Sequence, residues 1–278
     1  MRRRLPGAQH LRPRELRRAV PAPAGIGDGA GESPPEALDW QGRPVRCEDC
    51  PHEDIQAEGR CDLGKACVAD RRGKRIDRFF ARNPDLAARY LAHPYFEVRT
   101  LAAKHASLFL IGPLLADPEP EVRAMAVMRL PAGRVRVLRA DPDRRVRMAV
   151  AQRLEGGDLL SMMADEDYYV RLIVVRRAPP AALVRLVYDA EPEVRRAVAR
   201  RVADQYPSNM VGDPNPLVRL AVAERLPPQR LTVLARDADM RVRFAVAERL
   251  PVAALPLLAE DPVDAVRDLA RRRITEGD

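Results

Sequence analysis

The strongest constraint on the fold is a repeat with a period of 24 residues, which begins at about residue 93. The dipeptide Val-Arg starts at residues 98, 122, 146, 170, 194, 218, 242 and 266, without a single insertion. An aspartate precedes each of the last seven valines by five residues. A fixed period of about 20 to 50 residues is typical of solenoids, in which each repeat packs only on its neighbours. We therefore predict a solenoid of about eight repeats.

Each repeat has the pattern of one α-helix followed by a shorter helix, as residues 117–140 illustrate. Asp117 is a preferred helix N-cap, and the proline after it suits the first helical turn. Apolar residues follow with the spacing of one helix face, at Val122, Met125, Ala126 and Leu130. Pro131 disfavours helix in the residue before it, so the helix should end there after about 12 residues. Val135 and Leu138 lie three residues apart, which fits a short α- or 3-10 helix.

Residues 78–278 are therefore predicted to form an all-α solenoid of 24-residue repeats, each an α-helix plus a short 3-10 helix. One such helix is marginal alone, so its apolar face must pack on neighbouring repeats. A further arginine follows each of the last seven valines by seven residues, at Arg129, Arg153, Arg177, Arg201, Arg225, Arg249 and Arg273. We expect these arginines to reach carbonyl groups at a helix C-terminus, or to pair with an aspartate of a neighbouring repeat. An array that binds phosphate is the alternative.

All four cysteines of the chain lie close together in the sequence, at Cys47, Cys50, Cys61 and Cys67. A tight group of cysteines in a chain without a secretory signal more often binds metal than forms disulfides. The spacing C-x2-C-x10-C-x5-C suits a structural zinc ion or a [4Fe–4S] cluster, each of which takes four thiolates. The spacing alone leaves both open, and free or disulfide-bonded cysteines are a third reading. His52 could replace one cysteine as a ligand, although a surface histidine is the simpler expectation.

The N-terminal part divides into two predicted segments. Residues 1–44 form a basic tail or linker rich in Pro and Gly, in which Arg12, Arg14, Arg17 and Arg18 could form one or two basic helical turns. Residues 45–77 form the four-cysteine module. This module has too few apolar side chains to bury a sufficient core, so bound metal must supply much of its folding energy.

Composition and charge limit the class of partner and the cell compartment that we expect for this chain. The formal net charge of +8 suggests an acidic partner such as nucleic acid, but Lys65, Lys74 and Lys104 are the only lysines among 48 basic residues. This arginine excess points to coding bias, which weakens the nucleic-acid argument. The sequence has no apolar run long enough for a membrane span and no secretory leader, so a cytoplasmic protein is expected.

No catalytic motif is visible, and we expect a protein that is not an enzyme. A solenoid exposes a long surface suited to a macromolecule, so the leading hypothesis is a scaffold that binds a protein partner not identified by the sequence. The alternatives are an electron-transfer protein and a nucleic-acid-binding protein with a structural metal site.

The repeat pattern D-P-x3-V-R-x-A-V-A-x-R-L-P, complete at residues 213–227, resembles the leucine-rich repeat variant family. The four-cysteine segment looks like the iron–sulfur module found with those repeats, and the resemblance covers roughly residues 45–278. It implies alternating α- and 3-10 helices in two layers of a right-handed superhelix. It also implies a [4Fe–4S] cluster ligated by Cys47, Cys50, Cys61 and Cys67, and a link with nitrogen-fixing bacteria. This chain departs from the pattern in its first repeat, where His93 replaces the aspartate, and at residues 204–212, which lack the usual Leu-Pro.

Overall fold

The computed structural model describes residues 37–277, so most of the predicted tail, including Arg12, Arg14, Arg17 and Arg18, lies outside the described residues. Helices dominate the described part, and β-pairing there is limited to two isolated bridges, Leu38–Pro44 and Asp62–Ala66. The α-helices are α1 (Glu53–Ala57), α2 (Gly73–Arg82), α3 (Phe96–His105), α4 (Pro120–Arg129), α5 (Ala132–Val135), α6 (Arg144–Arg153), α7 (Gly156–Leu160), α8 (Tyr168–Arg177), α9 (Pro192–Ala199), α10 (Pro216–Ala223), α11 (Met240–Arg249) and α12 (Asp264–Glu276).

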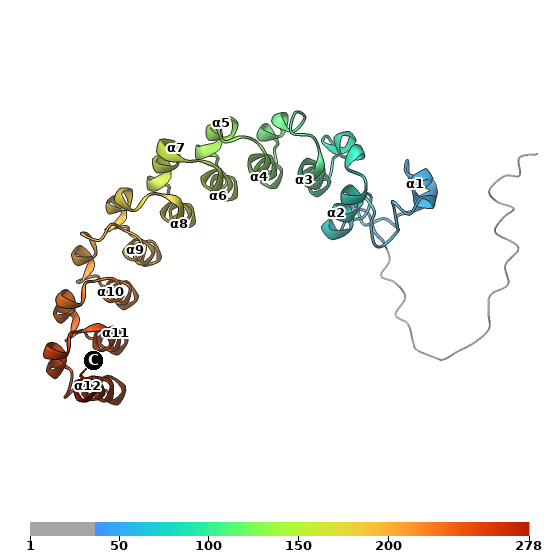
Figure 1. The fold of residues 1–278 in the computed structure, drawn as a ribbon. Coiled ribbons are helices and arrows are strands. Elements are labelled where there is room, and N and C mark those ends of the chain that lie inside the picture. Colours follow the sequence, from blue (N-terminus) through green and yellow to red (C-terminus); the bar gives the residue numbers. More distant parts are fainter. Residues whose placement is uncertain (1–36, 278) are drawn as a thin grey trace, which may run out of the picture. The chain divides into compact units, whose positions relative to one another are not determined.

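The 3-10 helices are η2 (Cys47–Asp49), η3 (Pro84–Tyr90), η4 (Gly112–Ala116), η5 (Arg136–Ala140), η6 (Ser161–Ala164), η7 (Pro180–Leu186), η8 (Pro207–Met210), η9 (Pro228–Leu234) and η10 (Val252–Leu257). Within residues 37–277 the long helices α2, α3, α4, α6 and α8 to α12 form one row, on the inner side of the curve, and the short helices form the outer row (Figure 1). The predicted all-α solenoid of alternating long and short helices is confirmed.

The core lies between the two rows. In and just after α4 the side chains of Val122, Ala126, Val127 and Leu130 are at most 1% exposed, and their equivalents in α3, α6 and α8 to α11 are similarly buried. Alanine and valine on this face let neighbouring helices approach closely, since interaxial distance depends on side-chain size. One continuous hydrophobic cluster runs from Ile55 in the cysteine module to Ala270 in α12.

The expected N-cap role of the repeated aspartate is wrong. Helix α4 begins at Pro120 with Glu119 at its N-cap, and spans 10 residues. Asp117 lies just before that position, where its Oδ1 accepts a hydrogen bond of 2.9 Å from the amide of Glu119. The proline of the first helical turn is therefore Pro120 and not the one that follows Asp117. The predicted end is confirmed, because Leu130 before Pro131 already has extended backbone.

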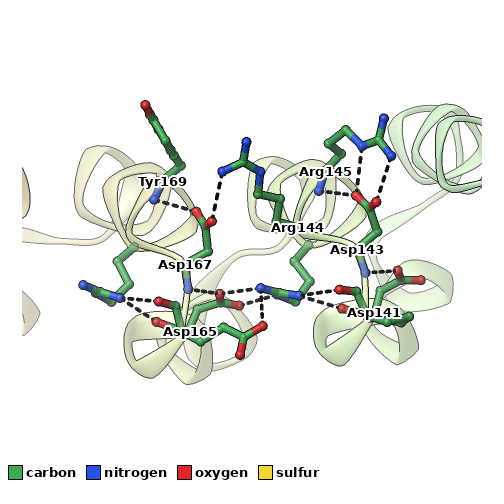
Figure 2. Close-up of polar contacts among 11 residues, drawn as sticks. Asp141, Asp143, Arg144, Arg145, Asp165, Asp167 and Tyr169 are labelled. Atoms are coloured by element: carbon green, nitrogen blue, oxygen red, sulfur yellow. Dashed lines mark hydrogen bonds and ion pairs between the residues drawn. The ribbon is translucent and has the colours of Figure 1, made fainter.

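The carboxylate of each repeated aspartate, such as Asp117, is bound by an arginine of the preceding repeat. Arg123, the arginine of the Val-Arg dipeptide, donates from Nε and Nη2 to the two carboxylate oxygens of Asp141. Its Nη1 donates to the carbonyl oxygen of Asp117 at 2.8 Å. The same bidentate pair joins Arg99–Asp117, Arg147–Asp165, Arg171–Asp189, Arg195–Asp213, Arg219–Asp237 and Arg243–Asp261. We call this row the Arg–Asp ladder; Figure 2 shows its aspartates at Asp141 and Asp165.

The arginines seven residues after each valine reach helix carbonyls, as predicted, but those of the preceding repeat. Arg129 of α4 donates from Nη1 to the carbonyl oxygens of Ala103 and Ala106, each at 2.7 Å. These carbonyls lie at the C-terminal end of α3, where a helix leaves acceptors unpaired. The arginines thus satisfy polar groups between repeats, because the long helices stack in parallel with their C-terminal ends side by side.

A degenerate repeat that the sequence analysis missed precedes the first Val-Arg unit. Asp70 accepts a hydrogen bond of 2.9 Å from the amide of Arg72, which repeats the turn at Asp117. Helix α2 follows and ends at Arg82, with Asn83 as its C-cap, and the short helix η3 begins at Pro84. This unit lacks Val-Arg and is one residue shorter, so the 24-residue spacing did not reveal it. Helix α2 crosses the boundary expected at residue 77.

In the first full repeat, His93 takes over the turn role of the missing aspartate. Its Nδ1 accepts a hydrogen bond of 3.1 Å from the amide of Tyr95. The carbonyl oxygen of His93 accepts from Arg99, as the aspartate carbonyls do in later repeats. The backbone turn is therefore kept despite the substitution, since it needs a hydrogen-bond acceptor and not a charge.

None of the helices in residues 37–277 combines the length and hydropathy of a membrane span.

Candidate metal centre

The four cysteines come from the segment that precedes α2. Cys47 opens η2 and Cys50 follows it, whereas Cys61 lies after α1 and Cys67 lies in the turns between α1 and α2. Cys61 and Cys67 are 7% and 4% exposed, and Cys47 and Cys50 are half-buried. All four are free thiols in the described structure, so the disulfide reading has no support there.

The fold brings the four thiols into mutual electrostatic contact. The Cys61 thiol donates a hydrogen bond to Cys67, which raises the pKa of Cys61 and lowers the pKa of Cys67 to about 7. Burial is the first cause that raises the pKa of Cys47 and of Cys50, and the charge of Cys67 raises both further. A thiolate at one cysteine therefore makes deprotonation of the others less favourable. A bound cation removes this repulsion, because metal coordination deprotonates a thiol.

The backbone around Cys67 favours a thiolate. The amides of Ala69 and Asp70 both lower the pKa of Cys67 by hydrogen bonding. No three histidine, cysteine or carboxylate side chains between residues 37 and 277 are arranged to hold one single metal ion. The donor set, four neighbouring thiols of which two are buried, has the chemistry that an iron–sulfur cluster with four cysteine ligands requires. The residues present therefore fit such a group.

His52 is not the surface histidine that was expected. Its side chain is only 5% exposed and packs against Phe79 of α2, with ring centroids 5.3 Å apart. Its Nε2 is hydrogen bonded to the hydroxyl of Tyr90, and burial lowers the pKa of its imidazole. The two aromatic residues lie 27 and 38 positions further along the chain, so the residues next to His52 carried no signal of this burial.

A cavity of about 560 Å³ adjoins one of the four thiols. Cys50 forms part of its wall, together with Arg46, Val68, Tyr90 and His93. The cavity brings solvent close to Cys50, whereas Cys61 and Cys67 are packed into the core. A group held by the four cysteines would therefore be close to solvent on the side of Cys50.

Comparison with known proteins agrees with both parts of the chain. A family model described as "LRV protein FeS4 cluster" matches residues 37–89, which contain all four cysteines. A second model, "Leucine rich repeat variant", matches residues 168–191 and 240–263. The first match indicates an iron–sulfur cluster module, and it begins before the predicted start at residue 45.

Two relatives extend this likeness. An uncharacterised 27.7 kDa protein in the nifB 3′ region of Rhodobacter capsulatus is 49% identical over 81 residues, which are 29% of this chain and 33% of that protein. The match thus spans about a third of that curated relative. A solved structure described as a leucine-rich repeat variant with a novel repetitive protein structural motif has a TM-score of 0.78 and 40% identity, and the match covers 82% of this chain and 98% of that one. The repeats, the cysteine module and this match over nearly the whole of a solved structure lead to one conclusion: the chain belongs to the leucine-rich repeat variant family.

Proposed function

We propose that this protein is a cytoplasmic scaffold that binds a protein partner along its long helices, and that it acts by binding and not by catalysis. The single observation that supports this best is the exposed face of the long helices. Their buried face packs toward the short helices, while residues such as Tyr169, Arg176 and Glu248 on the opposite face are exposed. Such an uninterrupted surface, repeated helix after helix, suits an elongated partner.

The same proposal assigns Cys47, Cys50, Cys61 and Cys67 as the ligands of a [4Fe–4S] cluster. When bound, this cluster links its four cysteines and supplies one-electron redox chemistry. The hydrophobic cluster supports a structural role, because Ile55, Cys61 and Val68 continue directly into Ile76 and Phe79 of α2. The cysteine module would then cover the first helix of the solenoid, as terminal caps do in other repeat proteins.

The distribution of charge favours a protein partner over nucleic acid. Each arginine of the Arg–Asp ladder is paired with an aspartate, and the arginines of the Arg129 type are engaged with carbonyl groups. Much of the basic excess thus serves the solenoid itself. Nucleic-acid binding would require affinity that falls steeply with salt, so a salt titration with random DNA and RNA tests this alternative.

Electron transfer is the second candidate function, and the cavity beside Cys50 favours it. Redox partners must approach a cluster closely, and this thiol lies on the wall of an open cavity. A reversible one-electron reduction at a physiological potential would support electron transfer. A cluster that is destroyed on reduction would leave only the structural role.

Two measurements test the leading proposal. The protein purified without oxygen should contain about four irons and four sulfides per chain and absorb broadly in the visible range. Stoichiometric zinc without colour would contradict the cluster and leave a structural zinc site, the alternative that the spacing allowed. The first measurement therefore decides the nature of the metal centre.

The second measurement concerns the partner. The photoreactive residue p-benzoylphenylalanine placed at Leu220, a half-buried residue at the edge of the exposed face of α10, should cross-link a discrete protein in the source cell. The same residue at Val233 of η9, exposed on the outer row, serves as the control. The name of the Rhodobacter capsulatus relative makes cells grown under nitrogen-fixing conditions the first choice. Equal labelling at both positions, or none at Leu220, would contradict a scaffold that binds through its long helices.

A further inference from the structure

One position of the repeat forms a row along the exposed face of the long helices. It lies six residues after each Val-Arg valine and is occupied by Lys104, Met128, Gln152, Arg176, Arg200, Glu224, Glu248 and Arg272. Adjacent members of this row reach one another, since Arg200 Nε lies 3.9 Å from Glu224 Oε2. Arg176 stands one repeat before Arg200, as Glu224 stands one repeat after it. Two arginines therefore lie side by side at the ends of α8 and α9.

A third arginine joins them on α9. Arg196 lies one helical turn before Arg200, and its Nε is buried without a hydrogen-bond partner among the described residues. Neither Arg176 nor Arg196 forms an ion pair with any residue in 37–277. A buried donor without an acceptor costs free energy, and neighbouring like charges repel. Among residues 37–277, Glu224 is thus the only ion-pair partner of these three neighbouring cations.

The position of Arg196 makes this cluster unusual within the solenoid. The equivalent residues on the neighbouring long helices are Met148, Leu172, Leu220 and Phe244, which are apolar and half-buried. Arg196 therefore interrupts a half-buried apolar stripe that borders the exposed face. A residue that stabilised the fold would be expected to match its neighbours, whereas a ligand-binding residue need not.

We propose that Arg176, Arg196 and Arg200 bind the carboxylates of an acidic segment in a protein partner, whose apolar residues contact Leu172 and Leu220. This inference rests on the proposed scaffold function and names the chemistry of its partner. Guanidinium groups recognise carboxylates by paired hydrogen bonds, and neither Arg176 nor Arg196 forms an ion pair within residues 37–277. The apolar residues on either side give the segment a second means of attachment.

Nucleic acid fits the same surface less well. Beyond α9 the exposed face carries Glu224, Glu248, Asp264 and Asp268, so a phosphate backbone that continued along the helices would meet repulsion. The cluster of three arginines lies on two helices, with apolar residues on both sides of it. A short acidic and apolar peptide matches this arrangement, whereas a continuous polyanion does not.

The test uses the full cluster-containing chain and a short fluorescent peptide of alternating glutamate and leucine, read by fluorescence anisotropy. Arg176→Gln and Arg200→Gln should each weaken binding about tenfold, as expected for a lost charged hydrogen bond. Arg272→Gln is the matched control, because it removes the same charge at the same repeat position in α12. A control peptide with glutamine in place of glutamate should bind the unsubstituted protein weakly. Its affinity should be no higher than that of the acidic peptide for the protein with both Arg176→Gln and Arg200→Gln.

Arg196→Leu separates a binding role from a structural one. Leucine is the residue of the neighbouring helices at this position, so this variant should unfold at higher urea concentration while losing affinity for the peptide. A loss of stability instead would identify Arg196 as a structural residue and overturn its assignment. Unchanged peptide affinity in the Arg176→Gln and Arg200→Gln proteins would overturn the whole proposal. The proposal would also be overturned if oligothymidylate bound through these arginines with higher affinity than the peptide.

Failure of the acidic-segment proposal can be distinguished from failure of the scaffold function. If Leu220 cross-links a discrete partner whose affinity is unchanged by Arg176→Gln with Arg200→Gln, the scaffold function stands and the acidic segment is wrong. If no partner is cross-linked at the long helices, the scaffold function fails irrespective of the peptide result.

Discussion

Arg123 and Asp141 lie in successive repeats and are joined by two parallel hydrogen bonds, each 2.8 Å long. Both side chains are largely buried, and Asp141 also accepts the amide of Asp143. The pair links the long helix of one repeat to the turn that begins the next. Since the same pair recurs along the solenoid, its removal at one point tests how the repeats hold together.

The variant Asp141→Asn should lower the free energy of unfolding by about 3 kcal/mol. Asparagine keeps the acceptor for the Asp143 amide but leaves the Arg123 guanidinium without its counter-charge. Urea unfolding followed by circular dichroism measures the change. Glu166→Gln is the control, because Glu166 also contacts a ladder arginine, Arg147, but its side chain is 82% exposed. An equal effect of both substitutions would contradict the importance of burial.

The Arg–Asp ladder should make the solenoid sensitive to acid. The Arg243 guanidinium is the main cause that lowers the pKa of Asp261 below its usual value, and burial opposes this only in part. In Asp117 and Asp237 burial raises the pKa, but the paired arginines and backbone amides outweigh it, so the net direction is also down.

A carboxyl group whose pKa is depressed in the folded state stabilises the protein above its unfolded pKa of about 3.9. This contribution should therefore be complete near neutral pH and lost as the pH falls through the folded pKa values, below about pH 4. Urea unfolding at a series of pH values measures it. A free energy of unfolding that stayed constant down to about pH 3 would contradict the linkage.

The arginines of the Arg129 type should stabilise the ends of the preceding helices. Arg177 donates to the carbonyl oxygens of Ala151 and Leu154 at 2.6 and 2.7 Å. Arg177→Ala leaves both acceptors without this donor and should cost about 1–3 kcal/mol. Its neighbour Arg176 points to solvent, so Arg176→Ala should change the stability little. Hydrogen exchange of α6 should rise in the first variant alone.

Removal of the metal should loosen one end of the solenoid and not the other. Anaerobic treatment with a chelator should increase hydrogen exchange in residues 45–90, because the module buries too little apolar surface to fold without metal. The distal helices α10 to α12 should keep their protection, since each repeat packs only on its neighbours. Uniform loss of protection along the chain would show that the module controls the whole solenoid. A protein treated with buffer alone is the control.

The periodicity of the sequence determined the repeat length, the long and short helices and the face that is buried. These features follow from local rules, because helix spacing and proline positions act within a few residues. The spacing of the cysteines likewise proposed Cys47, Cys50, Cys61 and Cys67 as one set. It did not distinguish iron from zinc, since both accept four thiolates.

Only the tertiary structure decided which of the repeated residues contact one another. Asp117 looked like an N-cap, but its partner Arg99 lies 18 residues earlier in a neighbouring helix. Every position of a perfect repeat has the same period, so spacing alone cannot say which position contacts which. Stacking of the helices chose Arg123 for Asp141 and left Arg129 for the carbonyls of α3.

Burial of individual polar residues was also decided by packing. His52 became a core residue because Phe79 and Tyr90, distant in sequence, close over it. Among the described residues Arg196 has no ion-pair partner, because Leu172 and Leu220 occupy the equivalent positions of the neighbouring helices. The sequence by itself therefore determined the elements and their repeat, since these depend on local spacing. The tertiary structure decided the polar contacts and the candidate binding surface, since these depend on which helices lie side by side.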